Sequence, residues 1–159
     1  MKTLCIIPCG NQKIWKKKPN AGPTPARDVY TGSFASKCRQ YATTFYPDSY
    51  VILSAKYGFL WPDDIIPENY NVTFKKRSSN PISIPELAII ARSKGLLSFD
   101  ELVVIAGREY VAMVRQVFQG KEIHNPLDGC AGNGIMMNRL DTAIKNGCRK
   151  TLDKSEHMC

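Results

Sequence analysis

Long apolar runs are missing from this chain of 159 residues. A helix that crosses a bilayer needs about 20 consecutive apolar residues, so we expect no membrane association. The N-terminus, from Met1 to Pro8, has an apolar run too short for the core of a signal peptide, and it lacks a small-residue cleavage site. We therefore expect a cytoplasmic protein whose first apolar run is a buried strand.

The chain also lacks the residue spacing typical of disulfide frameworks and metal sites. None of its six cysteines forms a CxxC pair, and only His124 and His157 could assist them. We interpret the cysteines as free, mostly buried thiols, because disulfide frameworks are typical of proteins with a small core in an oxidising compartment, and neither is indicated here. A zinc site from Cys5, Cys9 and Cys130 stays open as a minor alternative, although zinc ligands usually lie closer together in sequence. We expect neither a metal nor a cofactor.

Acidic residues are scarce, since 14 Asp and Glu stand against 22 Lys and Arg, for a formal net charge of +8. The basic residues form two clusters, one of Lys13 and residues 16–18 and the other of residues 75–77. Such clusters attract anions, although for any single lysine a solvated surface is the simpler explanation. Together they favour DNA, RNA or a nucleotide as the partner. The oligomeric state stays open.

Apolar runs and helical spacing alternate along the chain. Short apolar runs predict buried strands at 3–7, 50–53, 101–106 and 122–124. Helical spacing predicts helices that begin near Ser33, Pro85, Gly107 and Gly134. Residues 8–25 and 58–85 are rich in turn formers and are predicted as long connections, which are often functional.

This alternation predicts an α/β fold. We expect a single Rossmann-like domain over residues 1–148, with a mainly parallel sheet of about four or five strands and helices on both faces. Residues 149–159 are predicted to be a polar, flexible tail. No internal repeat or shift in composition indicates a second domain.

Polar residues and glycines gather just after the predicted strands. Because ligands collect beyond the carboxyl ends of parallel strands, these loops predict a basic site for a phosphate-bearing ligand, centred on Leu53 to Gly58. The candidate ligand-binding residues are Cys9, Gly10, Lys13, Tyr30, Ser54, Tyr57, Gly58, Tyr70, Gly107, Arg108, Tyr110 and Asn125. The glycine-rich stretch 129–134 matches neither the GxGxxG nor the GxxxxGK[ST] spacing, which excludes an ATP-type phosphate loop and a dinucleotide fingerprint.

Three residues are the candidates for catalysis. Lys56 could neutralise a phosphate, and Asp64 or Asp128 could activate water or stabilise a developing cation. The alternatives are a surface lysine and surface or helix-cap carboxylates. Cys9 is a nucleophile only if its pKa is lowered, and a small buried thiol is the better interpretation. The candidate tyrosines could stack on bases.

The segment from Leu53 to Tyr70, with its Tyr-Gly turn and its later Pro, acid and Tyr, resembles the central motif of the YaaA family. The wider pattern includes Cys9-Gly10, Tyr30-Thr-Gly and Gly107 with Tyr110, and spans about residues 4–145. It is similar to small uncharacterised bacterial and phage domains related to YaaA, and to the accessory domain of archaeal tRNA-guanine transglycosylases. The resemblance implies a Rossmann-like sheet distantly linked to the uracil-DNA glycosylase fold, DNA binding and a nucleobase ligand.

Two classes of function follow, with a third alternative. The first is an enzyme that processes a nucleotide or nucleic acid, such as an N-glycosidase that releases a base with Asp64 or Asp128 at the reacting centre. The second is a non-catalytic DNA- or RNA-binding module, which needs only the charge and the aromatic side chains. The third is a phage or host interaction protein on the same scaffold.

Overall fold

The computed structural model describes residues 2–147. The predicted tail, residues 149–159, lies outside the described residues. The core is a sheet in the order β4-β3-β1-β6-β7. Its strands are β1 (Thr3–Pro8), β3 (Tyr50–Ser54), β4 (Gly58–Leu60), β6 (Glu101–Val104) and β7 (Glu122–His124). β1 pairs in parallel with β3 and β6, β6 pairs in parallel with β7, and only β4 is antiparallel to its neighbour β3.

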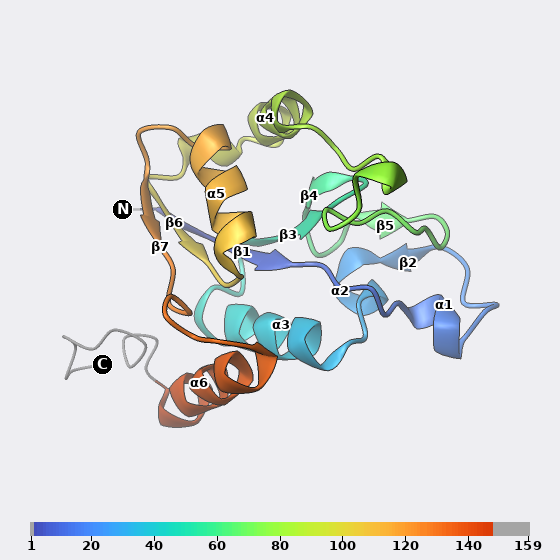
Figure 1. Cartoon of the computed structure of the whole chain (residues 1–159), viewed down its shortest axis with the longest axis horizontal. Coiled ribbons are helices and arrows are strands. Elements are labelled where there is room, and N and C mark those ends of the chain that lie inside the picture. The colour runs from blue at the N-terminus through green and yellow to red at the C-terminus, as the bar shows by residue number, and fades with distance from the viewer. Residues whose placement is uncertain (1, 148–159) are drawn as a thin grey trace.

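Helices cover both faces of this sheet (Figure 1). α3 (Ser33–Phe45) and α6 (Asn133–Asn146) pack on one face, and α4 (Ile84–Ser93) and α5 (Arg108–Val117) on the other. Residues alternate along β1, so that Cys5 and Ile7 belong to the core under α3 and α6, while Leu4 and Ile6 belong to the core under α4 and α5. The predicted α/β fold, with a mainly parallel sheet and helices on both faces, is confirmed and is compatible with a single Rossmann-like domain.

Local sequence signals explain where the helices begin and end. The Ser83 hydroxyl accepts a hydrogen bond from the Glu86 N–H, and the Glu86 carboxylate accepts one from the Ser83 N–H, which forms a capping box at α4. α6 ends at Gly147, whose φ of 63° lies in the left-handed region that glycine adopts without strain. These signals lie within a few residues of each helix end, which is why they could be recognised in the sequence.

The two predicted long connections contain structure of their own. Residues 8–25 include α1 (Ile14–Lys17) and β2 (Thr24–Pro25), and α2 (Ala26–Val29) follows directly. Residues 58–85 include β4, β5 (Ile65–Ile66) and a 3₁₀ turn, η1 (Arg77–Ser79); a second 3₁₀ turn, η2 (Leu96–Ser98), follows α4. β2 and β5 form a separate antiparallel pair. Such short elements show no recognisable hydrophobic periodicity in the sequence. They are stabilised by the burial of side chains such as Trp15 and Ile66.

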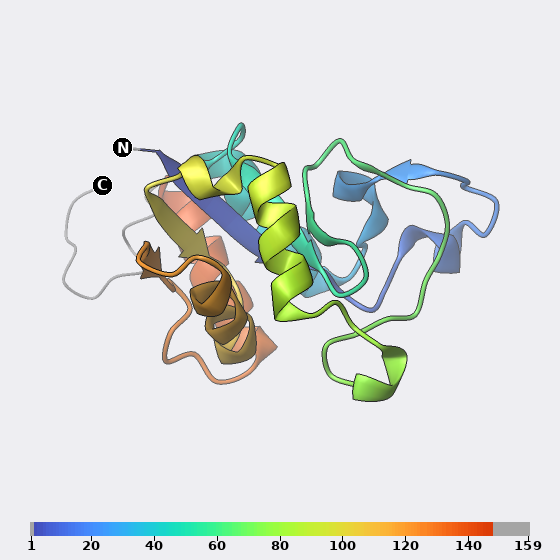
Figure 2. The ribbon, with the colours of Figure 1, turned by 90° about the horizontal axis from the view of Figure 1, so that it is seen from above.

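The connections fix where a ligand site can lie. The chain leaves β1 for β3 through α3 on one face, and leaves β6 for β7, on the other side of the sheet, through α5 on the opposite face. The sheet therefore has a topological switch point between β1 and β6, where the loops after the two strands diverge and leave a crevice. The connection after β5 lies at the same end of the molecule as α1 and β2 (Figures 1 and 2).

Within residues 2–147, no helix combines the length and the apolar character that a crossing of the bilayer requires.

Candidate functional site

The loop after β1 is held against Tyr30. Lys13 and Tyr30 form an isolated antiparallel bridge, and the Thr31 N–H donates to the Gln12 carbonyl at 3.1 Å. This pairing brings Lys13 to the carboxyl edge of the sheet. The Lys13 residue is only 7% exposed, whereas Asn11 in the same loop is exposed.

A chain of buried hydroxyl groups connects three of the predicted residues. The Ser54 hydroxyl oxygen accepts from the backbone N–H groups of Lys56 (3.2 Å) and Tyr57 (3.1 Å). Both of its lone pairs are then occupied, so its own proton is donated to the Tyr70 oxygen, 2.9 Å away. The Tyr70 hydroxyl also forms a hydrogen bond with the Tyr30 hydroxyl. Burial raises the pKa of Tyr70 to about 12, although the hydrogen bonds with Ser54 and Tyr30 oppose the rise.

Two ammonium groups lie over the Tyr70 ring. The Nζ atom of Lys13 is 4.5 Å from the ring centroid and that of Lys56 is 5.6 Å from it. Lys56 is exposed and also lies 5.3 Å from the Tyr57 ring centroid, and the Tyr57 ring meets the Tyr70 ring edge-on. The face of an aromatic ring attracts cations, so Tyr70 positions both lysines at the edge of the sheet.

Cys9 and Tyr110 connect the loops after β1 and β6, on either side of the switch point. Burial raises the pKa of the Cys9 thiol, although hydrogen bonds with the Ala55 backbone and the Tyr110 side chain, together with the charge of Lys13, oppose the rise. Burial likewise raises the pKa of Tyr110, whose ring meets Phe74 edge-on. Cys9 is therefore a protonated thiol at neutral pH, which agrees with the buried-thiol interpretation.

Two open cavities lie beside this cluster. One, of about 430 Å³, is lined by Asn11, Asn71, Thr73, Lys76, Ser78 and Ser79. The other, of about 360 Å³, is lined by Asn11, Lys13, Lys16, Asn69, Tyr70 and Asn71. Because they share Asn11 and Asn71, the two cavities are together called the carboxyl-edge groove. Each is large enough for a small ligand.

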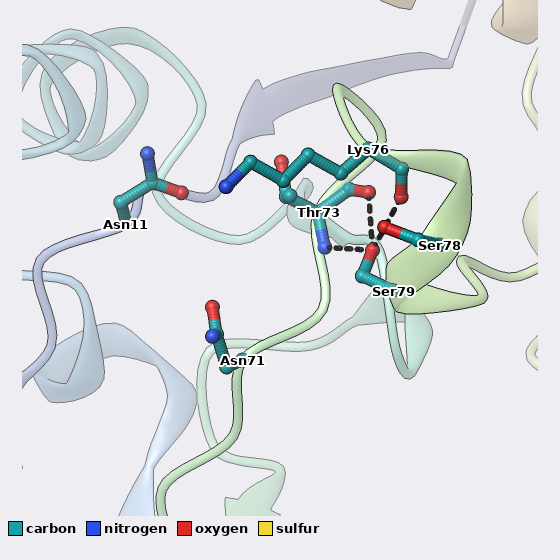
Figure 3. Close-up of a pocket in the computed structure, with 6 residues that line it drawn as sticks. All are labelled: Asn11, Asn71, Thr73, Lys76, Ser78 and Ser79. Carbon is teal, nitrogen blue, oxygen red and sulfur yellow. Dashed lines mark hydrogen bonds between the residues drawn. The ribbon is translucent and has the colours of Figure 1, made fainter.

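Figure 3 shows the larger cavity. The Lys76 side chain extends across it toward Asn11, and Asn71 approaches from below. Ser79 fixes this wall, because its hydroxyl accepts from the Thr73 N–H at 3.0 Å and lies within hydrogen-bonding distance of the carbonyls of Thr73 and Lys76. All of the lining residues given above carry amide, hydroxyl or ammonium groups, and none is acidic.

The two candidate catalytic acids lie outside the residues that line the groove. The Asp64 carboxylate accepts from the Trp61 N–H at 2.8 Å and pairs with Lys94 at the end of α4, so it stabilises the turn between β4 and β5. Asp128 is exposed in the loop before α6, where Arg139 donates to its backbone carbonyl at 3.3 Å. Neither contact places a carboxylate beside Tyr70.

The remaining candidates have diverse environments. Gly58 has a φ of 77°, and a Cβ atom there would lie 2.7 Å from Ile90 Cδ1, so its backbone packs against α4. Gly10 lies against Ala35, and Gly107 is the N-cap of α5, with Arg108 exposed beside it. The Asn125 side chain accepts from the Leu127 N–H at 3.2 Å, which closes a local turn.

The minor zinc alternative is not supported. Within residues 2–147, the one group of potential ligands close enough to share an ion is Glu101, Glu122 and His124, and it includes no cysteine. Cys5, Cys9 and Cys130 are therefore not brought together, because Cys5 lies in the core under α3 while Cys130 follows β7 in the loop before α6.

Several groove residues were absent from the candidates chosen on sequence. They are Asn11, Lys16, Asn69, Asn71, Thr73, Lys76, Ser78 and Ser79. Two signals for them were present: Lys16 and Lys76 belong to the basic clusters, and the remainder lie in the long connections or, for Asn11, in the loop after β1. Polar loop residues become recognisable as a group only when the fold places them around one cavity.

Comparison with known proteins identifies the family. A model of a family of unknown function, DUF6884, matches residues 4–140. The chain belongs to this family. It is also 42% identical over 146 residues, 91% of this chain and 97% of the relative, to the uncharacterized protein YfjM of Bacillus subtilis strain 168. No solved structure matches the chain significantly.

These matches correct the family assignment made from motifs. The resemblance to the YaaA family and to the accessory domain of archaeal tRNA-guanine transglycosylases was wrong, because the matching family is DUF6884 and the curated relative is YfjM. The motif that suggested YaaA runs from Leu53 to Tyr70, and much of it has a structural role here. Gly58 makes the turn into β4, and Asp64 caps the turn after it. Such turn and packing requirements can recur in unrelated α/β domains.

Proposed function

We propose that this DUF6884 protein binds a nucleotide or a strand of nucleic acid in the carboxyl-edge groove. The observation that carries the proposal is the composition of the groove, where Lys13, Lys16 and Lys76 stand among amides and hydroxyls without an acidic residue. A groove lined by charge of one sign concentrates ligands of the opposite sign. Phosphate is the anion that suits lysines spread along an open surface.

The uncharged groups of the groove suit the other parts of a nucleotide. The amides of Asn11, Asn69 and Asn71 offer both donors and acceptors, as base edges require, and hydroxyls such as Thr73 can bond to sugar or phosphate oxygens. The partly exposed Tyr57, whose ring contacts that of the groove residue Tyr70, offers an aromatic ring on which a base can stack. The position of the groove beyond the carboxyl ends of the strands is where open α/β sheets bind ligands.

The groove favours binding over the hydrolytic alternative. Release of a base by an N-glycosidase requires a group that activates water or stabilises an oxocarbenium-like centre, a role assigned on sequence to Asp64 or Asp128. Asp64 is occupied by Lys94 and the Trp61 N–H, and neither acid lines the groove. Binding needs no such group.

We also propose that binding takes place in the cytoplasm. Cys5, Cys9, Cys38 and Cys130 are free thiols, as is usual in a reducing compartment that also contains nucleotides and nucleic acid.

The test is a binding titration with fluorescent single-stranded DNA, single-stranded RNA and nucleotides at several salt concentrations. Affinity should fall as salt rises, because bound lysines release counterions from phosphates. Lys16→Ala and Lys76→Ala should each weaken binding and reduce the salt slope by about 1. Lys145→Ala is the matched control, since it removes the same charge from the exposed side of α6.

Two outcomes would refute this proposal. One is an absence of binding to all of these ligands at low salt, which would favour the interaction-protein alternative. The other is an equal loss of affinity in Lys145→Ala and Lys76→Ala, which would mean that binding depends on the net charge of the protein and not on the groove. Mass spectrometry of the same mixtures separates binding from catalysis, because a released base would establish the N-glycosidase alternative.

A further inference from the structure

Lys13 is unusual among the lysines of residues 2–147. The residue is 7% exposed, and lysines are almost never buried without an acidic partner. Lys37 and Lys94 pair with Asp141 and Asp64, but Lys13 has no ion-pair partner within residues 2–147. The Lys13 Nζ atom lies 4.5 Å from the Tyr70 ring centroid and donates a long hydrogen bond of 3.5 Å to the Asn11 carbonyl.

This environment makes the neutral amine of Lys13 more accessible than that of an exposed lysine. Burial lowers the pKa of Lys13, and the nearby Cys9 thiol only partly opposes the change. The protonated ammonium group has no free electron pair, so a lysine acts as a nucleophile only in its neutral form, and desolvation is one way in which proteins produce that form. The side chain also lines the smaller cavity, so a bound ligand can reach it.

The surroundings indicate the kind of ligand on which such an amine could act. Lys16 lines the same cavity and Lys76 the adjoining one, and both are exposed where they can hold a phosphate. Asn69 and Asn71 can bond to the hydroxyl groups of a sugar. Lys13 therefore stands where the sugar of a phosphate-bearing ligand would lie.

We propose that the Lys13 Nζ atom forms an imine with the open-chain aldehyde of a sugar phosphate bound in the carboxyl-edge groove. The nitrogen electron pair attacks the carbonyl carbon, and a proton moves from nitrogen to the carbonyl oxygen to give a carbinolamine. Loss of that oxygen as water then leaves the C=N bond, so that one amine and one aldehyde yield one imine and one water. The phosphate part of this inference rests on the proposed function, whereas the amine chemistry rests on Lys13 alone.

The test traps the imine by reduction. The full-length protein is incubated with cyanoborohydride and either ribose 5-phosphate or a single-stranded oligonucleotide that contains one abasic site, and the modified residue is located by peptide mass spectrometry. We expect Lys13 to carry the largest share of the adduct. Lys13→Arg introduces a guanidinium group that forms no imine, so this variant should lose the adduct, while Lys17→Met, a change at a neighbouring exposed lysine, should keep it.

The two probes distinguish the source of the sugar. A stronger adduct with the oligonucleotide indicates a strand, and a stronger adduct with ribose 5-phosphate indicates a free sugar phosphate. Either result supports the imine. An adduct spread evenly over exposed lysines, or one undiminished in Lys13→Arg, would overturn it, and mapping on the wild-type protein decides the matter even if the variant folds poorly.

A further pair of measurements separates this inference from the proposed function. Binding of an intact oligonucleotide, without an adduct from the abasic one, would overturn the imine and leave the binding function standing. An adduct on Lys13 that forms equally well with glycolaldehyde, which has no phosphate, would support the amine chemistry and count against phosphate binding.

Discussion

Replacement of Tyr70 by Phe tests the buried hydroxyl chain at the centre of the site. Tyr70→Phe keeps the ring beneath Lys13 and Lys56 and removes only the oxygen that contacts Ser54 and Tyr30. The Ser54 residue is fully buried and Tyr30 is 2% exposed, so water has little access to their hydroxyl groups once that oxygen is gone.

The expected loss of stability follows from the number of buried polar groups that lose their hydrogen-bond partner. The Ser54 oxygen already accepts from two backbone N–H groups, and its proton can turn to the Tyr30 oxygen once the Tyr70 oxygen is gone, so one buried polar group rather than two loses its partner. A buried polar group left unsatisfied costs about 1–3 kcal/mol. With one buried group left unsatisfied, we expect Tyr70→Phe to lower the free energy of unfolding by about 2 kcal/mol.

Urea denaturation followed by circular dichroism measures this loss. A decrease of this size should move the midpoint by about 1 M or more. Tyr57→Phe is the matched control, since it removes a phenol oxygen from a partly exposed ring, and it should change stability by less than about 0.5 kcal/mol. If Tyr70→Phe is as stable as Tyr57→Phe, the buried hydroxyl chain does not stabilise the fold.

Two further predictions concern stability. Gly58→Ala should lower the free energy of unfolding, measured by thermal denaturation, by about 1–3 kcal/mol, because it places alanine in the left-handed region with a Cβ atom 2.7 Å from Ile90 Cδ1. Gly134→Ala is the control: a Cβ atom there would have nothing within 4 Å, so the change should be neutral or slightly stabilising. Similar losses of stability in both variants would count against tight packing at Gly58. Burial raises the pKa of the Cys5 and Cys38 thiols above the ordinary value of 9.0. Above pH 9.0 these thiols therefore lose their protons in the unfolded chain but keep them in the folded one, so the free energy of unfolding should fall as pH rises. In denaturant titrations at several pH values above 9.0, the free energy of unfolding of Cys38→Ala should fall less steeply with pH than that of the wild type. Equal slopes would show that the Cys38 pKa is not raised by burial.

The sequence by itself determined the architecture and the edge of the sheet at which the groove lies. Strands such as β1 and β6 are continuous apolar runs, and parallel pairing brings their carboxyl ends to one edge whatever the detailed packing. Lys13, Tyr30, Ser54, Tyr57 and Tyr70 could be chosen in advance because each follows a strand or lies in a connection that returns to that edge. Their convergence is a consequence of topology.

Only the tertiary structure decided which polar residues belong to the groove and which serve the fold. Asp64 and Lys76 lie in the same connection, yet Asp64 turns to Lys94 and the Trp61 N–H while Lys76 extends across the groove. Nothing in local spacing separates the two, because the path of a long connection depends on contacts with residues distant in sequence, such as those of β5 with β2. The same reason explains why the burial of Lys13 against Tyr70, 57 positions later in the chain, became visible only in the folded protein.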